Sequence, residues 1–507
     1  MRSTKTMIED FYARHVRPTV RLKHVLLISV FFLIGTLVSL HSTDDALSAR
    51  WTGANSAPRL QQALHLQDAE HRRLAWNHGK GKSWVNVSHP QESFYQTLLP
   101  DVRYATALIQ GGLSNQLVGS LELLDYAQRS GRVGVLNDFV RYPIIDDAEH
   151  PPQDRLPVVS TFLLFCFSDH DIVRSAHLLY VSNSQYQKEM IFDLARYTEL
   201  TSHPSLTFRD LKNSSTTLDQ LACIAPQSGI LSLTNKPPVR MSEEMNMNKI
   251  QPEGVQVNVW PCPIETGSNQ AISMAGLVEF SEGGWWDFYE RTVTTQNGGS
   301  EFGSLNRNFV CWADMYWVTD KQDIFSRWDP NWPGWTNVGK YLRYSTHLEN
   351  LKDRYTDLVL GQHAQSNLPG HQRPFIAIHA RHNDFPCSDQ TSATCFKSAT
   401  TYLEEITRIK KVLLDEQGVV IGDQDVIMFS DEVNPHWWNE VTDVLGWKRV
   451  DHKVLNTLDS MDNWWPTLID MAMMSSAKGF IGSKGSTYSL FASLRVQDWN
   501  DGVISIV

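Results

Sequence analysis

Two stretches in the C-terminal part of the chain decide the predicted fold: FIAIHARHNDF at Phe375–Phe385 and GFIGSKGSTYSLFASLR at Gly479–Arg495. Each begins with a short apolar run, typical of a buried strand, and then turns into small, polar or basic residues. In an open α/β sheet, ligands bind in the crevice at the carboxyl ends of such strands. Arg381 offers a rigid guanidinium fork, and Ser486 and Thr487 open a predicted helix. The sequence therefore predicts that these loops bind a phosphate-bearing ligand.

Strands and helices alternate around these two stretches. The predicted strands are 375–380, 426–430, 447–450 and 479–481, and the predicted helices are 400–416, 465–476 and 487–496. Leu403, Ile406, Ile409 and Leu413 are spaced to lie on one buried face of the first of these helices. Alternation of this kind predicts a parallel sheet.

The first globular segment begins in a similar way. A strand is predicted at Tyr104–Ile109, a tight loop at Gly111–Gln116, a helix at Leu117–Ser130 and a second strand at Val133–Leu136. This is the opening unit of a Rossmann-like domain. The predicted fold is therefore α/β and GT-B-like, with two Rossmann-like domains that face a cleft. Residues 140–345 show no readable alternation; a helix follows at 341–360.

The N-terminus carries an uncharged apolar run, Val25–Leu40, which spans roughly 24 Å as a helix. Basic residues precede it and Asp44 and Asp45 follow it, so the positive-inside rule places the bulk of the chain in the lumen. We expect a single-pass type II membrane protein of the endoplasmic reticulum or Golgi. A cleaved signal peptide is the alternative.

Composition limits the class of protein. The chain has 507 residues, 42% of them hydrophobic and 20% charged, which fits a globular protein of two or more domains. A net charge of −11 argues against general nucleic-acid binding.

The six cysteines include no CxxC pair, so disulfides are favoured over a zinc site. Cys387 and Cys395 are close enough in sequence to close a small loop. Asn86 and Asn213 lie in glycosylation triplets.

The motifs resemble those of a known family. His379–Phe385 resembles the HxRxxDF/W motif of the GDP-fucose protein O-fucosyltransferases, and Gly111–Gln116 is similar to their GRFGNQ or GGLNQ loop. Asp470 and the Gly482–Ser489 loop are similar to their third motif. The resemblance implies a GT-B fold and an inverting transfer of fucose from GDP-fucose to a protein Ser/Thr hydroxyl, with neither metal nor cofactor.

The same resemblance implies roles for individual residues. Arg381, His379 and Asn115 are the predicted catalytic residues. Arg381 stabilises the charge that develops on the leaving phosphate, and His379 and Asn115 orient the donor from opposite walls. The predicted GDP-sugar-binding residues are Gly111, Gly112, Ser114, Asn115, His379, Arg381, Asp384, Asp470, Ser486, Thr487 and Tyr488. In this set Asp470 binds the guanine edge, Ser486 and Thr487 bind phosphate, Tyr488 packs near the base and Asp384 pairs with Arg381 or its neighbours.

The predicted organisation follows from these assignments. It comprises a cytosolic tail (1–23), a transmembrane signal anchor (24–42), a stem (43–100), an acceptor-side Rossmann-like domain (101–365) and a GDP-sugar-binding Rossmann-like domain (366–507). The expected partners are a GDP-sugar donor, a protein or glycan acceptor, and the membrane through Val25–Leu40. No general base is assigned, because Glu122 and Asp125 lie too far along the first predicted helix.

Several alternatives remain open from the sequence. Asp169-His170-Asp171 is a DxD triplet of the kind that holds manganese in metal-dependent glycosyltransferases, and Asp423-Gln424-Asp425 is another. A glycan fucosyltransferase of the α1,6 type has similar motifs, and a non-catalytic lumenal binding protein can share the fold. The tryptophans at 285, 286, 328, 332 and 335 fit either a core or a sugar site.

Overall fold

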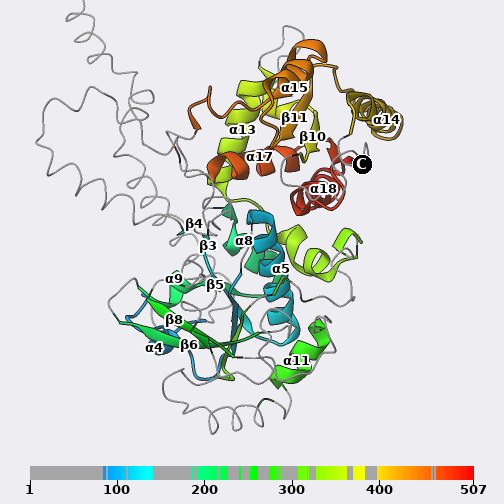
Figure 1. The fold of residues 1–507 in the computed structure, drawn as a ribbon. Helices are drawn as coiled ribbons and strands as arrows, with labels where there is room; N and C mark the ends of the chain where they lie inside the picture. The colour runs from blue at the N-terminus through cyan, green and yellow to red at the C-terminus, as the bar shows by residue number, and fades with distance from the viewer. Residues whose placement is uncertain are drawn as a thin grey trace, which may run out of the picture. The chain divides into compact units, whose positions relative to one another are not determined.

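The computed structural model shows a mixed α/β protein with largely parallel sheets (Figure 1). Residues Leu64–Val507 form one compact unit. The structure describes residues 84–86, 89–109, 112–140, 185–186, 191–213, 217–225, 239–240, 252, 254–260, 273–282, 286, 306–313, 315–316, 318, 327–329, 331–361, 369–382, 397–457, 461 and 464–507. Within these ranges no helix is long and apolar enough to cross a membrane. The predicted anchor at 24–42 lies outside them.

The C-terminal sheet is parallel throughout, in the order β12-β11-β10-β13-β14. Its strands are β10 (Ile376–Ala380), β11 (Val426–Ser430), β12 (Lys448–Arg449), β13 (Gly479–Gly482) and β14 (Val503–Ile506). From β10 the chain adds β11 and β12 on one side, and it then adds β13 and β14 on the other. This is the order of a doubly wound nucleotide-binding sheet, and its topological switch point lies between β10 and β13.

The helices of this part are α14 (Ala399–Gln417), α15 (Pro435–Asn439), η7 (Glu440–Val444), α17 (Trp465–Ser475) and α18 (Thr487–Asn500). Three of them, α14, α15 and α18, begin at a side-chain cap. The Ser398 side chain accepts the Thr401 N–H and starts α14, and Gly418 ends that helix in a left-handed conformation with φ 67°. Ser486 caps α18 by accepting the Ser489 N–H.

The N-terminal sheet has the order β5-β2-β1-β9-β6-β8-β7, with β7 antiparallel to β8 and the other pairs parallel. Its strands are β1 (Tyr104–Ala107), β2 (Val133–Leu136), β5 (Ser205–Thr207), β6 (Asp219–Ile224), β7 (Val239–Arg240), β8 (Val255–Trp260) and β9 (Phe309–Trp312). β3 (Phe139–Val140) pairs separately with β4 (Gln185–Tyr186). A disulfide between Cys223 and Cys311 joins β6 to β9.

The helical elements that accompany this sheet, or follow it in the chain, are α4 (Phe94–Thr97), α5 (Leu113–Arg129), α8 (Leu194–Thr201), α9 (Phe208–Leu211), α11 (Met274–Glu282), η4 (Gly334–Val338), η5 (Gly339–Tyr341), α13 (Thr346–Leu360) and η6 (Gly370–Gln372). α5 packs on β1 and β2 and also contacts α18. It therefore links the two sheets.

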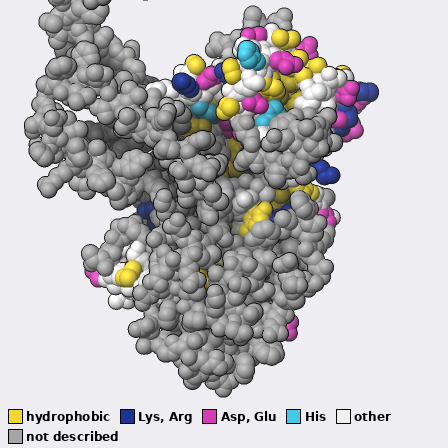
Figure 2. Space-filling view, viewed as in Figure 1, with side chains coloured by type: hydrophobic (Ala, Val, Ile, Leu, Met, Phe, Trp, Pro, Cys, Tyr) yellow, Lys and Arg dark blue, Asp and Glu magenta, His cyan; other side chains and the backbone are white. Residues whose placement is uncertain are grey.

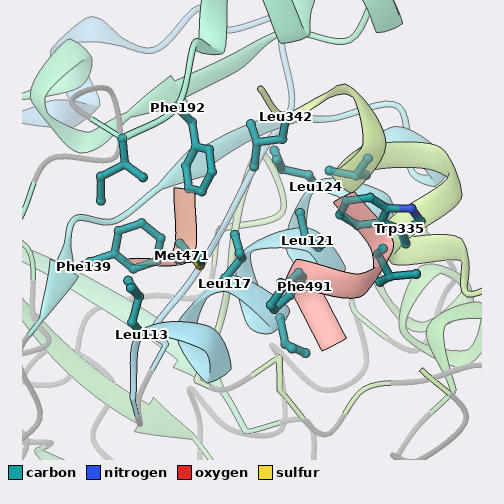
Figure 3. Packing of buried hydrophobic residues seen from close by; sticks show 14 of the residues in the cluster. Leu113, Leu117, Leu121, Leu124, Phe139, Phe192, Trp335, Leu342, Met471 and Phe491 are labelled. Atoms are coloured by element: carbon teal, nitrogen blue, oxygen red, sulfur yellow. The ribbon is translucent and has the colours of Figure 1, made fainter. Parts of the chain in front are cut away.

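The largest hydrophobic cluster forms around α5. Figure 3 shows leucines of this helix, among them Leu117 and Leu121, in the same cluster as Met471 of α17 and Phe491 of α18. Trp335 is also buried in this cluster. A shared core of this kind holds the N-terminus of α5 in a fixed relation to the C-terminal helices.

The predicted parallel α/β arrangement is confirmed, and the predicted helices and strands of the C-terminal part all form within a few residues of their expected ends. The helix after β1 begins at Leu113 rather than Leu117. Ser114 and Asn115 therefore lie in its first turn and not in a loop. The sequence left two possible roles for the tryptophans, in the core or in a sugar site. Trp286, Trp332 and Trp335 are buried core residues.

Candidate active site

The ends of β10 and β13 bring the two C-terminal motifs together. His379 lies near the end of β10 and Arg381 just after it, while the Ser483–Ser486 loop connects β13 to α18, which begins at Thr487. Because β10 and β13 are neighbours on either side of the switch point, the connections that follow them run to opposite faces of the sheet. A crevice for a ligand opens at this position in doubly wound sheets. The predicted phosphate-binding loops therefore share one site.

Two serines tie these loops to each other. The Arg381 N–H donates to Ser483 Oγ at 3.0 Å, and that hydroxyl donates to the His379 carbonyl at 3.0 Å. The Ser483 N–H donates to Ser489 Oγ at 3.0 Å, and the same oxygen lies 2.6 Å from His379 Nδ1. The main chain at the end of β10 is thus fixed by the loop that carries Ser486 and Thr487.

His379 is held as a neutral imidazole. Its side chain is buried, and burial, followed by the charges of Arg381 and His382, lowers its pKa to about 3. Ser489 Oγ accepts the Ser483 N–H and shares a second hydrogen bond with His379 Nδ1, whose direction depends on the imidazole tautomer. In either tautomer the neutral ring keeps one nitrogen that donates and one that accepts. His379 can therefore orient a ligand without carrying a charge.

Arg381 is positioned by a carboxylate from the neighbouring strand. Its Nε lies 3.4 Å from Asp431 Oδ2, and its side chain is 31% exposed. The other oxygen of Asp431 accepts the His382 N–H at 2.7 Å. The partner that the sequence suggested, Asp384, lies outside the described residues. Asp431 could have been suspected, because it directly follows a predicted buried strand at the same edge of the sheet.

The N-termini of α5 and α18 meet at this site. Thr487 Oγ1 donates to Asn115 Oδ1 at 2.9 Å and accepts from Ser114 Oγ at 2.8 Å. Both helix ends carry unsatisfied N–H groups and a partial positive charge. Three predicted site residues are thereby in direct contact, although Asn115 and Thr487 are far apart in the sequence.

The glycine pair before α5 is described only in part. Gly112 is the N-cap residue, and a Cβ added there would have no atom within 4 Å. Space therefore does not require glycine at this position, and a larger side chain would fit. The other predicted glycine, Gly111, lies outside the described residues.

Asp470 lies beside this region on α17. Its Oδ1 is 2.9 Å from His452 Nε2, and burial raises the pKa of Asp470 while His452 opposes that rise. The Tyr488 hydroxyl donates to the Thr467 carbonyl, one turn before Asp470, and the Tyr488 ring meets the His379 ring edge-on at 5.0 Å. Tyr488 thus connects the backbone of α17 to the His379 ring. The partner His452 was not identified from the sequence.

The carboxylates of α5 lie inside the protein. Glu122 is buried, accepts from Trp332 Nε1 at 2.9 Å and lies 3.5 Å from Arg327 Nε. Burial raises the pKa of Glu122 to about 7. Asp125 accepts from Asn337 at 2.8 Å and pairs with Arg129. Both carboxylates therefore have structural partners, and the general base stays unassigned.

The two DxD triplets have different outcomes. Asp169–Asp171 lies outside the described residues. In the other triplet, Asp423 pairs with Lys410 and Asp425 with Arg373, so the two carboxylates bind separate cations. Across the described ranges, no cluster of three or more His, Cys, Asp or Glu side chains is arranged to hold a metal ion.

A pocket of about 500 Å³ opens next to the Arg381 network and shares His382 and Glu432 with it. Trp437, Trp447 and Tyr402 provide aromatic walls, and the N-terminus of α14 lies at its edge. Figure 2 shows the surface around α14 and α15, where hydrophobic, histidine and acidic side chains lie side by side. Glu432 itself accepts two backbone N–H groups and contacts His382 Nδ1 at 2.9 Å.

Comparison with known proteins gives matches in structure only. No protein-family model matches the chain, and no curated protein matches its sequence. The chain is similar to the apo form of POFUT1, a GDP-fucose protein O-fucosyltransferase, at 14% identity and a TM-score of 0.46, over 80% of this chain and 98% of that chain. The POFUT1 complex with GDP-fucose matches at 13% identity and a TM-score of 0.46 over the same shares.

A second group of matches is bacterial. The fucosyltransferase NodZ from Bradyrhizobium matches at 12% identity and a TM-score of 0.31, over 78% of this chain and 94% of that chain. A NodZ structure soaked with GDP-fucose, described as an alpha-1,6-fucosyltransferase, matches at 13% identity and a TM-score of 0.30, over 78% of this chain and 93% of that chain.

Proposed function

We propose that this chain is an inverting, metal-independent glycosyltransferase of GT-B architecture that transfers fucose from GDP-fucose to a protein Ser/Thr hydroxyl. One observation carries the proposal. Thr487 bonds to Ser114 and Asn115, while Ser483 and Ser489 tie the same loop to His379 and Arg381. The three motifs that resemble the O-fucosyltransferases therefore surround one site.

The residues of this site suit departure of a diphosphate. In an inverting transfer, the acceptor oxygen bonds to the anomeric carbon as the bond from that carbon to the β-phosphate oxygen breaks, and the proton of the acceptor hydroxyl passes to the departing diphosphate or to solvent. Negative charge then grows on the phosphate, and a preorganised guanidinium stabilises it more in the transition state than in the ground state. Arg381, held by Asp431, has that role. The N-termini of α5 and α18 add donors for the phosphates.

The test is calorimetric titration of the full-length chain with GDP in the presence of a chelator. We expect wild type to bind GDP, and Arg381→Ala to weaken binding at least about tenfold, because a charge-assisted hydrogen bond is lost. Turnover of GDP-fucose should fall about 100- to 1000-fold. Arg408→Ala is the matched control, because this exposed arginine on α14 pairs with Glu405. GDP-mannose and UDP are titrated in the same way, to compare a different sugar and a different base with GDP.

The other outcomes separate the alternatives. Binding that requires manganese would move the proposal to a metal-dependent site such as Asp169–Asp171. No binding of GDP under either condition would indicate a non-catalytic protein. Activity on oligosaccharides but not on folded Ser/Thr-containing domains would favour the glycan fucosyltransferase.

We further propose that this site lies in the lumen of the secretory pathway, behind the predicted anchor. The disulfide between Cys223 and Cys311 supports an oxidising compartment. Asn86 and Asn213 are exposed, as glycosylation acceptors must be. Thiol labelling of the chain inside intact secretory vesicles checks this, since both cysteines should remain unlabelled.

A further inference from the structure

A chain of hydrogen bonds runs from the interior of the protein to Asp470. The Tyr355 hydroxyl on α13 lies 2.7 Å from Thr457 Oγ1, and Thr457 Oγ1 lies 3.0 Å from His452 Nδ1. His452 Nε2 then lies 2.9 Å from Asp470 Oδ1. The sequence motifs include Asp470 alone among these four residues.

One assignment of protons satisfies the whole chain. The Tyr355 hydroxyl donates to Thr457, the Thr457 hydroxyl donates to His452 Nδ1, and His452 Nε2–H donates to Asp470. Every donor points toward Asp470. Thr457 is fully buried, and the Tyr355 and His452 rings lie 5.8 Å apart, so neighbouring side chains hold the imidazole in place.

This chain keeps Asp470 as an oriented acceptor. Burial raises the pKa of Asp470, whereas the hydrogen bond from His452 favours the ionised carboxylate. The bond also occupies Oδ1 and fixes the plane of the carboxylate, while the side chain remains 24% exposed. A planar carboxylate that can only accept is complementary to two adjacent N–H donors, such as the ring N1–H and 2-amino group of guanine.

We propose that His452 is a positioning residue that gives the site its preference for guanine, by holding Asp470 as an oriented, ionised acceptor. This inference rests on the proposed function, in which a GDP-sugar is the donor. His452 acts through Asp470 and does not itself touch the nucleotide. Its loss should therefore reduce discrimination between bases more than it reduces binding of the phosphates.

The test compares GDP with inosine diphosphate, which lacks only the 2-amino group. Calorimetric titration of the full-length wild type should show a preference for GDP of about tenfold, the size expected for a bidentate base contact. His452→Ala and Asp470→Asn should bring this ratio close to one. His452→Gln, which can still donate through its amide, should restore part of it.

The controls separate a local effect from misfolding. His436 is exposed on α15, and His436→Ala should keep the wild-type ratio. Thermal unfolding of each variant shows whether it folds. If His452→Ala does not fold, the comparison of wild type with His452→Gln still tests the inference. If His452→Ala weakens GDP and inosine diphosphate equally, the role of His452 is only structural and the inference is wrong. If wild type binds neither nucleotide, the proposed function itself fails.

Discussion

At the scale of single residues, position could be predicted from the sequence but partners could not. Alternation along a strand placed His379 and Arg381 on the same side, at the end of β10. Ser489, which contacts His379, lies 110 positions from it in the sequence. Asp431, which pairs with Arg381, directly follows the neighbouring strand β11. Strand patterns do not reveal such contacts, because they depend on the pairing order of the sheet.

His379 should make the protein sensitive to mild acid. Its pKa falls from 6.5 to about 3 on folding, so the unfolded chain takes up a proton below pH 6.5 while the folded chain does not. The stabilisation is complete above pH 6.5 and is lost as the pH falls toward 3. Between pH 7.5 and pH 5 the free energy of unfolding should fall by roughly 2 kcal/mol from this group.

Denaturant unfolding of wild type and His379→Asn at both pH values measures this contribution. The asparagine side chain is neutral at both pH values. Between pH 7.5 and pH 5, the free energy of unfolding of this variant should therefore fall by roughly 2 kcal/mol less than that of wild type. Equal decreases in the two proteins would show that His379 titrates normally.

At the scale of elements, helices and most of their buried positions were predicted well, with exceptions at one first turn and on one buried face. Leu403 was expected on the buried face of α14, yet it is 42% exposed and Tyr402 is buried instead. Both side chains are apolar and adjacent, so helical periodicity alone does not choose between them. Similarly, the glycine pair before α5 suggested a loop that extends to Gln116. Gly112 is instead the N-cap residue, and the helix begins at the next residue, Leu113.

The connection between β10 and α18 should depend on one hydroxyl. Ser489→Ala removes the partner of both His379 Nδ1 and the Ser483 N–H, in a fully buried position. The free energy of unfolding should fall by roughly 1–3 kcal/mol, because buried polar groups then lack partners. Chemical denaturation measures the change.

Ser493→Ala on the same helix is the matched control. Ser493 is also buried, and its hydroxyl donates to the Leu490 carbonyl within α18 rather than to another element. Its loss should cost less than about 1 kcal/mol. Similar losses in the two variants would mean that the bonds between the loops add no stability.

At the scale of the whole molecule, the two sheets differed in how far they could be predicted. Strands of the C-terminal sheet follow one another with helices between them, and all but β14 were expected. In the N-terminal sheet, β6, β8 and β9 were not predicted, and the central strand β9 has only four residues. Its place beside β1 is set by long-range packing. The domain boundary near residue 365 stays a prediction.

The cysteine pairing was likewise not readable, and it should contribute to global stability. Cys223 and Cys311 close a loop with a sequence separation of 88, so the disulfide restricts the unfolded chain. Replacing both with alanine should lower the free energy of unfolding by roughly 2–4 kcal/mol. Wild type with a reductant should behave like the double variant. No change with the reductant would contradict a stabilising role.

The position of β9 in the sequence determines how late during translation the N-terminal sheet can be completed. β1 pairs with β2 on one side and with β9 on the other, and β9 follows about 200 residues later in the chain. While the ribosome makes the intervening residues, one edge of β1 lacks its neighbour and is open to wrong pairing. We expect the nascent chain to aggregate less readily once Phe309–Trp312 has emerged, and a fragment that stops before these residues would leave the sheet divided at its centre.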